Sequence, residues 1–382
     1  MTERSYLDYN ATAPLRPEAR EAMVAAFATF GNPSSIHAEG RAARAAIEAA
    51  REKVAGLLGT RSEDVIFTSG GTEANALGLA PQTRQARLFV SAVEHPSVLA
   101  GGRFSPAQVT RLPVDRDGVI DLDFLASELA KPHLEETGAR PLVALMVANN
   151  ETGALQPVGA ASEIIHSAGG VLHSDAVQAA GRVPLDLTAL GADMASLSAH
   201  KLGGPKGVGA LVLRKGVAVE PLLKGGGQER RRRAGTENVA GIVGFGVAAE
   251  LAAAELDRTL AIAGLRDALE ARARSLVPEA VVLSARVARL PNTSCIAVPG
   301  TKAETLVIGL DLAGIAVSSG SACSSGKVEA SHVLSAMGVA GELTQGAIRV
   351  SLGRDSTPAD IDRFVEAWGA LIKRLKQSRE AA

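Results

Sequence analysis

The sequence predicts an α/β protein whose main part is a mostly parallel β-sheet with helices on both faces. From about residue 60 to residue 215, short apolar or β-branched runs alternate with helical patterns, an order that is typical of parallel sheets. Several of these runs are hydrophobic throughout, as expected of strands that are covered on both sides. Because 382 residues exceed the usual length of one domain, we expect a second, smaller α/β unit as well.

The expected elements follow in chain order. Alanine-rich segments at 16–30 and 37–58 predict two helices before the sheet, and Gly59 ends the second. A long alanine-rich helix is expected from about Glu237 to Ala273, and it leads into a last region where strands and helices alternate. The strands of the main sheet are expected in VIFTS (65–69), RLFVSAVE (87–94), PLVALMVA (141–148), GVLHSDA (170–176), MASLSA (194–199) and GVGALVLR (207–214).

Composition and charge exclude several classes of protein. The formal net charge is −1, so electrostatics favours neither a nucleic acid nor an anionic membrane as a partner. The N-terminus lacks the apolar stretch of a secretory signal. The longest uncharged apolar stretch, from Val239 to Ala249, is far shorter than the roughly 20 residues that span a bilayer, which favours a buried helix. With two cysteines in so long a chain, a reducing cytoplasm is the expected location.

Polar residues follow several of the expected strands, at the edge where open parallel sheets bind ligands. In FTSGGTEANAL, Gly71 and Thr72 lie at a strand-to-helix turn. Such a turn can hold a phosphate, although a helix with a threonine cap has the same pattern. In GVLHSDAVQAAG, Asp175 follows a strand either as a helix cap or as the partner of a cationic ring nitrogen.

A lysine completes the set. Lys201 follows the next strand in MASLSAHKLGGPKG, where glycines remove steric cover and leave the amine free to form a Schiff base. Most lysines are simply solvated surface charges. A phosphate cup, an acid on one strand and a lysine on the next are, however, the groups that hold pyridoxal phosphate (PLP). The three places together therefore predict a PLP site.

These motifs, taken with others along the chain, resemble the cysteine desulfurases. The resemblance covers nearly the whole chain in order, in the motifs LDYNATAP, NNETG, HSDAVQ, SAHKLGGPKGVGAL, GGGQERRRRAGT and SSGSACSSG. It implies the PLP-dependent transferase fold type I of aminotransferase class V, with a mostly parallel seven-stranded sheet in the large domain. On this basis we expect a homodimer with active sites at its interface.

The resemblance also implies a division into domains. Residues 1–15 are expected to form an N-terminal segment that joins the small domain. Residues 16–255 are expected to form the large PLP-binding domain, and residues 256–382 a small C-terminal α/β domain that carries the loop with the catalytic cysteine.

The resemblance assigns each matching residue a role around the cofactor ring. Lys201 resembles the Schiff-base lysine, and Asp175 resembles the partner of the pyridinium nitrogen. His95 resembles the histidine that stacks on the ring and serves in proton transfer, and Gln178 and Asn150 resemble the groups that contact the ring hydroxyl. Taken alone, His95 has the ordinary reading of a satisfied surface or core histidine.

Further residues match the parts of the family that hold the phosphate and the substrate. The backbone amide of Gly71 and the side chains of three residues match the phosphate cup, and these are Thr72, Ser198 and His200. Thr236 resembles the residue that reaches the phosphate from the other subunit. Arg349 resembles the arginine that clamps the substrate carboxylate, in a pocket that Asn32 completes. Without the resemblance, Arg349 could equally be a structural ion-pair partner.

The two cysteines have different surroundings. Cys295 lies in an expected strand, TSCIAV, and its ordinary interpretation is a small buried hydrophobe. Cys323 lies among serine, glycine and alanine residues in SSGSACSSG, which predicts an accessible loop. The resemblance makes Cys323 the catalytic thiol.

The resemblance implies an activity as well. Sulfur would leave L-cysteine, giving L-alanine and a persulfide on Cys323, and would pass to an acceptor such as an iron–sulfur scaffold or a tRNA-thiolation protein. A selenocysteine lyase or another class V aminotransferase remains the alternative, whereas intact Lys201, Asp175 and His95 argue against a non-enzymatic sulfur carrier. The sequence has neither an HExxH motif nor paired CxxC motifs, so we expect no metal in the catalytic site.

Overall fold

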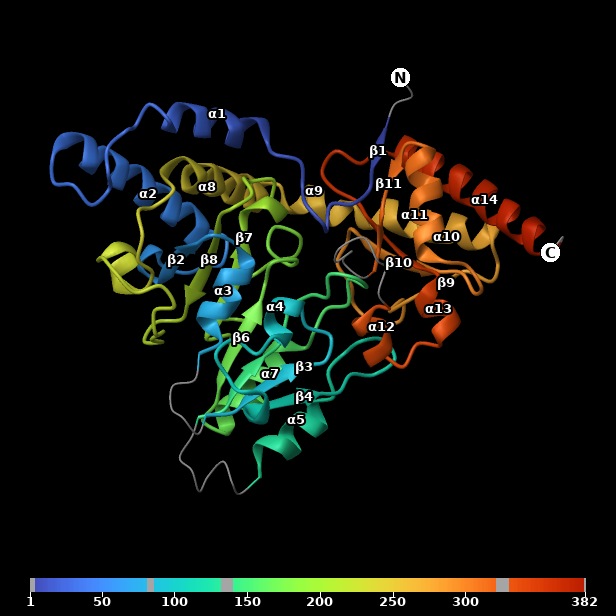
Figure 1. The fold of residues 1–382 in the computed structure, drawn as a ribbon, viewed down its shortest axis with the longest axis horizontal. Coiled ribbons are helices and arrows are strands. Elements are labelled where there is room, and N and C mark those ends of the chain that lie inside the picture. Colours follow the sequence, from blue (N-terminus) through green and yellow to red (C-terminus); the bar gives the residue numbers. More distant parts are fainter. Residues whose placement is uncertain (1–3, 81–85, 132–139, 321–329, 381–382) are drawn as a thin grey trace.

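The chain folds into two lobes, a larger one around a seven-stranded sheet and a smaller one around a four-stranded sheet (Figure 1). The computed structural model describes residues 4–80, 86–131, 140–320 and 330–380. Within these residues the main sheet is parallel except at one strand. The predicted α/β class and the mostly parallel main sheet are therefore confirmed.

The main sheet has the strand order β2-β8-β7-β6-β5-β3-β4. Strand β8 runs antiparallel to both of its neighbours, and the remaining pairs are parallel. Its strands are Val65–Thr68 (β2), Leu88–Ser91 (β3), Val109–Leu112 (β4), Leu142–Ala144 (β5), Val171–Asp175 (β6), Met194–Ser198 (β7) and Gly209–Leu213 (β8). Six of them coincide with the expected runs, and β4 at the edge was not among these.

Helices cover both faces of this sheet, which explains why its strands are hydrophobic throughout. Val65 and Phe67 of β2 belong to the core on one face, whereas Ile66 between them belongs to the core on the other face. The first face is covered by α2 (Ala38–Gly56), α5 (Leu122–Leu129), α7 (Val158–Ser167) and α8 (Val239–Ala254), and the second by α3 (Gly71–Gly78) and α4 (Pro96–Leu99).

The expected helix from Glu237 to Ala273 is wrong in its length. The structure has three helices there: α8, then α9 (Leu256–Ala261) and α10 (Ala263–Leu276). The break falls where the chain leaves one core for the other, since Ala252 packs in the core of the main sheet and Ile262 in that of the smaller lobe. Each helix must turn its own apolar side to its own core, which one straight helix could not do.

The smaller lobe is built on an antiparallel sheet of order β12-β13-β10-β9. Its strands are Val281–Val282 (β9), Thr293–Ala297 (β10), Ser318–Ser319 (β12) and Ala347–Ser351 (β13). Its helices are α10, α11 (Ala303–Leu312), α12 (His332–Ala336), α13 (Gly341–Gln345) and α14 (Pro358–Glu380). Near the N-terminus, β1 (Ser5–Tyr6) pairs in parallel with β11 (Ile315–Ala316), so the N-terminal segment joins this lobe, in which the C-terminal helix α14 also lies (Figure 1).

In the part of the chain that the structure describes, one further helix and several short turns connect these elements. Helix α1 (Pro17–Ala26) packs along α8, and short helical turns lie at Ser62–Asp64, Pro106–Gln108, Ala199–Lys201 and Gln228–Arg231. Among the described helices, none by itself has the length and apolar character needed to cross a membrane, although the pair Val239–Ala254 and Leu256–Leu276, bent by 64°, passes such a test jointly.

Candidate active site

A cavity of about 240 Å³ opens at the carboxyl ends of the parallel strands. Strand β6 ends at Asp175, β7 ends at Ser198, and β2 leads into the first turn of α3. Because these strands run in the same direction, the residues that follow them meet at one edge of the sheet. Nine of the predicted site residues line this cavity: Gly71, Thr72, His95, Asn150, Asp175, Gln178, Ser198, His200 and Lys201.

One end of the cavity is formed by the start of α3 together with β7. Gly71 and Thr72 are the first residues of α3, whose N-terminus presents free backbone amides and the positive end of the helix dipole. Ser198 is the last residue of β7, and His200 lies in the turn that follows, where its Nδ1 is 3.1 Å from Oγ1 of Thr12. Burial, with Lys201 nearby, lowers the pKa of His200 to about 4. This end therefore offers hydrogen-bond groups suited to a phosphate.

Asp175 is buried and firmly held at the end of β6. Its Oδ1 accepts a hydrogen bond from the backbone N–H of Val177 at 2.9 Å. Its Oδ2 accepts one from Nδ2 of Asn75 at 2.8 Å. A carboxylate has about four lone-pair positions, so Asp175 can still accept a hydrogen bond from a ligand in the cavity.

Lys201 lies three residues beyond β7, in the turn Ala199–Lys201. Its ammonium donates to the backbone oxygens of Asn10 and Ala11, the latter at 2.9 Å. Burial, reinforced by the positive charges of Arg182 and Arg349, lowers the pKa of Lys201 to about 7. The amine is thus partly neutral at neutral pH, which is the form that can attack an aldehyde.

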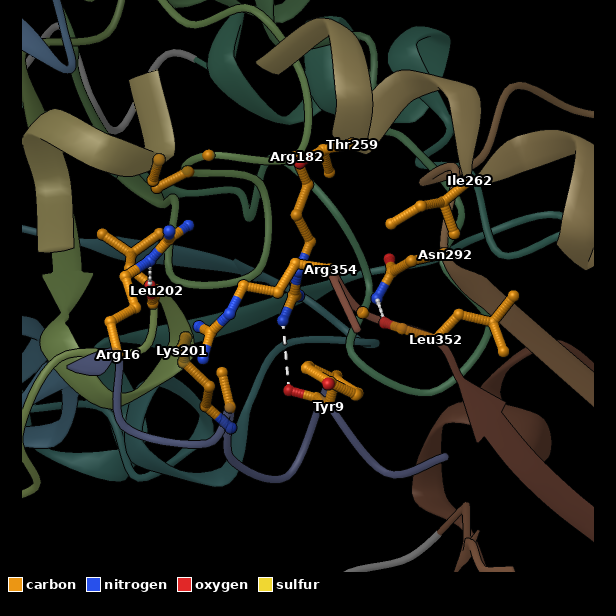
Figure 2. A pocket seen from close by; sticks show the side chains of 15 residues that line it. Tyr9, Arg16, Arg182, Lys201, Leu202, Thr259, Ile262, Asn292, Leu352 and Arg354 are labelled. Carbon is orange, nitrogen blue, oxygen red and sulfur yellow. Dashed lines mark hydrogen bonds between the residues drawn. The ribbon is translucent and has the colours of Figure 1, made fainter. Parts of the chain in front are cut away.

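Lys201 also borders a second, smaller cavity of about 50 Å³ between the lobes (Figure 2). Arg182 is buried there and donates to the backbone oxygens of Gln178 at 2.9 Å and of Tyr9 at 3.2 Å. It also donates to the side-chain oxygen of Gln178. Gln178 Nε2 donates to the backbone oxygen of Asn10 at 3.1 Å. Arg182 therefore fixes the orientation of the Gln178 amide: its oxygen faces Arg182 and its nitrogen faces the backbone oxygen of Asn10.

His95 occupies the N-cap position of α4. Its Nδ1 accepts a hydrogen bond from the backbone N–H of Ser97 at 3.1 Å and lies 2.7 Å from Oγ of Ser97. Burial lowers the pKa of His95, more than the carboxylate of Asp175 raises it. A neutral imidazole beside the cavity can stack on a planar ligand and exchange a proton with it.

Four predicted residues do not line the cavity. Arg349 lies on β13, where it forms an ion pair with Asp8 at 2.9 Å and donates to the backbone oxygen of Asn150 at 3.0 Å. This last contact brings it next to a residue of the cavity wall. Asn32 is exposed, and its Oδ1 accepts a hydrogen bond from the backbone N–H of Ser34 at 2.9 Å. Thr236 is exposed in the arginine-glycine loop. Cys323 lies outside the described residues.

Sequence reasoning missed two residues that support the site. Asn75, on α3, holds Asp175 and lines the cavity. Asn10 has its backbone oxygen bonded by Lys201 and Gln178, and its side chain donates to Thr293 Oγ1 at 2.9 Å. Both lie in motifs that drew attention for other residues, but a helical amide and a backbone carbonyl carry no signal of their role in a sequence.

The chemistry of the cavity fits PLP. A helix N-terminus with hydroxyl groups suits the phosphate, a buried carboxylate suits the pyridine nitrogen, and a lysine of lowered pKa suits the aldehyde. Asn150 and Gln178 also line the cavity. Among the described residues, no group of three or more histidine, cysteine, aspartate or glutamate side chains is placed to hold a metal ion.

Comparison with known proteins identifies the family of the chain. The profile of the family "Aminotransferase class-V" matches residues 5–364. The chain is 48% identical to a cysteine desulfurase of Cereibacter sphaeroides, across 98% of this chain and 97% of that protein. It is 43% identical to the cysteine desulfurase IscS of Dictyoglomus turgidum, across 98% and 96%.

Solved structures give the same result. The NifS-like protein of Rickettsia africae superposes with a TM-score of 0.89 at 37% identity, covering 97% of this chain and all of that one. A second NifS-like protein gives a TM-score of 0.88 at 36% identity, with the same coverage. The chain therefore belongs to the PLP-dependent class-V aminotransferase family, among its cysteine desulfurases.

Proposed function

We propose that this cysteine desulfurase takes the sulfur of L-cysteine onto Cys323 at the cavity beside Lys201, and releases L-alanine. The observation that carries the proposal is the convergence of a lysine, a carboxylate, a histidine and a phosphate-suited helix terminus on one cavity. The first three are Lys201, Asp175 and His95. An aminotransferase would need the same groups, so the thiol of Cys323 is what distinguishes the proposed reaction.

The cofactor would be held by residues at both ends of the cavity. Bound PLP supplies an electron sink that stabilises a carbanion at the substrate Cα. Asp175 would accept a hydrogen bond from the protonated ring nitrogen and so keep that nitrogen charged. Lys201 would hold the cofactor through its amine and would move the Cα proton of the substrate. Its lowered pKa of about 7 suits both tasks.

Arg349 is proposed to bind the substrate carboxylate. It is buried, and its Nε has no hydrogen-bond partner among the described residues. A buried guanidinium with an unused donor is costly unless a ligand supplies an acceptor. The role of Asn32 in the same pocket stays a prediction, because its side chain is exposed in this chain.

The sulfur step follows from the chemistry of thiols. The thiolate of Cys323 would attack the sulfur of the substrate, so that a sulfur–sulfur bond forms as the carbon–sulfur bond breaks. The electron pair of the broken bond stays with carbon, which takes up a proton and leaves as L-alanine. His95 and Lys201 both line the cavity and would carry the protons.

We propose a homodimer whose interface includes the segment after α1. Phe27, Phe30 and Ile36 are 72%, 85% and 90% exposed, which is unusual for large apolar side chains that lie close together in sequence. Gln228 of the arginine-glycine loop donates to Ser34 at 3.3 Å, so this loop adjoins the same surface. In a dimer, Thr236 of that loop would reach the phosphate site of the other subunit.

The sulfur acceptor, the location and the division into domains are proposals as well. The sulfur acceptor would be an iron–sulfur scaffold or a tRNA-thiolation protein, in the cytoplasm. The chain would divide into residues 1–15 with 256–382 and a large PLP-binding domain at 16–255; the pairing of β1 with β11 supports the joining of the two ends.

Mass spectrometry tests the proposed function. The purified chain, incubated with L-cysteine and then alkylated, should gain one sulfur atom on the peptide that contains Cys323, with L-alanine formed in step. Cys295 is the internal control, because burial raises its pKa to about 12. Transamination of other amino acids without added sulfur on Cys323 would point to an aminotransferase instead. Alanine and selenide released only from selenocysteine would point to a selenocysteine lyase.

A further inference from the structure

A continuous chain of hydrogen bonds links Asp175 to His95. Asn75, on α3 and 1% exposed, donates to Asp175 Oδ2 at 2.8 Å and to Ser97 Oγ at 2.9 Å. Ser97 Oγ in turn lies 2.7 Å from Nδ1 of His95. We propose that Asn75 is a positioning residue that, through Ser97, fixes His95 in the tautomer that carries its proton on Nε2. The inference rests on the proposed function for the catalytic roles of Asp175 and His95.

The orientation of the Asn75 amide is determined by its two polar neighbours. An ionised carboxylate accepts hydrogen bonds only, so the NH₂ group of Asn75 must face Asp175. The amide oxygen then points the other way, where it lies 3.0 Å from Nε2 of His173. Burial lowers the pKa of His173 to about 4, so this imidazole is neutral and can donate from Nε2. Both neighbours therefore require the same orientation.

The direction of the next hydrogen bond follows from the amide. Asn75 has one N–H left after its bond to Asp175, and it donates this N–H to Ser97 Oγ. A hydroxyl has a single proton, so Ser97 is free to donate that proton to the atom on its other side, Nδ1 of His95. The backbone N–H of Ser97 donates to the same Nδ1 at 3.1 Å and cannot accept.

Two donors thus converge on Nδ1 of His95, which must carry a lone pair. The pKa of His95 is lowered by burial and by the charges of Lys201 and His332, against the opposing effect of Asp175. In the neutral ring the proton then resides on Nε2, the nitrogen left free for the cavity that His95 lines. His95 therefore presents an N–H donor to the cavity, whereas a base at Nε2 would require the tautomer that carries the proton on Nδ1.

Nitrogen NMR of the purified, PLP-loaded protein labelled with ¹⁵N-histidine tests this directly. A protonated ring nitrogen and an unprotonated one differ widely in chemical shift, and a His95→Gln variant assigns the signals. We expect Nε2 of His95 to be protonated and Nδ1 to be unprotonated at pH 8. Protonation of Nδ1 in the wild-type neutral ring would overturn the inference, whatever the desulfurase activity proves to be.

Two variants of nearly equal volume test the part played by Asn75. In Asn75→Asp, the new oxygen can accept from Ser97, so the hydroxyl turns away from His95 and the share of the Nδ1-protonated tautomer should rise. In Asn75→Leu, Ser97 is free to accept from a protonated His95, whose pKa should rise by roughly 0.5 to 1 unit. Ser196→Ala is the matched control. Ser196 is a buried hydroxyl that lies 3.4 Å from His173, outside the series of hydrogen bonds that joins Asp175, Asn75, Ser97 and His95.

The outcomes separate the inference from the proposed function. A shift in the tautomer or pKa of His95 in the Asn75 variants, and none in Ser196→Ala, supports the role of Asn75. Unchanged His95 signals in both Asn75 variants would refute that role. If wild-type protein shows the expected tautomer but adds no sulfur to Cys323, the proposed function fails while the assignment of the proton stands.

Discussion

Replacing Arg51 by methionine should cost about 3–5 kcal/mol of unfolding free energy, the usual result of removing one partner of a buried ion pair. Arg51 of α2 holds Glu229 through two hydrogen bonds of 2.6 and 2.8 Å, and both side chains are almost fully buried. Without Arg51, the carboxylate of Glu229 keeps one buried donor, the backbone N–H of Phe67 at 2.9 Å. The guanidinium also lies 4.7 Å from the centre of the Phe67 ring, a contact that is lost as well.

The backbone next to this pair sets a limit on the loss. Glu229, Arg230 and Arg231 have φ values of 46°, 56° and 65°, a region that costs residues other than glycine of the order of 1–3 kcal/mol each. Such a turn persists only while its surroundings enforce it. If it relaxes once Glu229 is released, part of the cost is recovered, so the upper end of the range is a maximum.

Urea denaturation at fixed protein concentration measures the effect. Lys53→Met is the matched control, because Lys53 lies on the same helix and pairs with Glu250 at 2.7 Å at the surface, where such a pair contributes about 0–1 kcal/mol. The double variant Arg51→Met/Glu229→Met should recover much of the lost stability, since no buried charge remains. The reasoning is refuted if Arg51→Met costs no more than Lys53→Met.

Three further predictions concern buried groups. The rate at which the PLP-free chain takes up PLP, followed by absorbance, should rise with pH around a midpoint of about 7, because burial lowers the pKa of Lys201 to that value; a midpoint near 10 would contradict it. Gly78→Ala should lower the free energy of unfolding, measured by thermal denaturation, by about 1–3 kcal/mol, because the added Cβ would lie 2.5 Å from His173 Nδ1. Gly56→Ala is the control: its Cβ would meet nothing within 4 Å, so this variant should be neutral or stabilising. Burial raises the pKa of Glu151 from 4.5 to about 7, so the folded state binds more protons than the unfolded state between these two pH values. The free energy of unfolding should therefore fall as the pH rises through this range. Glu151→Gln should remove this dependence when unfolding is measured from about pH 4.5 to 8.

Most of the main sheet could be predicted because its strands carry their own signal. Each expected run is apolar on both faces, and the cores on the two faces account for that pattern. The edge strand β4 reads VTRL and leaves Arg111 exposed, so it lacks the continuous apolar character of the others. The break after α8 was missed because no proline or glycine marks it; it results from the position of two cores, which a local pattern does not record.

The site residues divide in the same way. Asp175 and Lys201 were found because they follow strands, where the topology of a parallel sheet gives a polar residue its meaning. Asn75 lies inside a helix, and its importance comes from a carboxylate a hundred residues further along the chain. The arginines of the GGGQERRRRAGT motif do not reveal their partners in the sequence, and the structure pairs Arg233 with Glu73 of α3 at 2.9 Å. Such pairings depend on tertiary contacts that spacing alone does not reveal.

Burial makes Cys295 a structural thiol, in contrast to the nucleophile proposed for Cys323. Cys295 is paired in register with Arg349 across β10 and β13, so it lies near the proposed carboxylate site. Its burial nevertheless raises its pKa to about 12, against the lowering effect of Arg349. At pH 7 Cys295 therefore stays in the thiol form, whereas the thiolate is the nucleophilic form. We therefore expect that Cys323→Ala will abolish persulfide formation without redirecting sulfur to Cys295, as peptide mass spectrometry after incubation with L-cysteine can determine. Added sulfur on Cys295 in that variant would mean that proximity to the substrate outweighs burial.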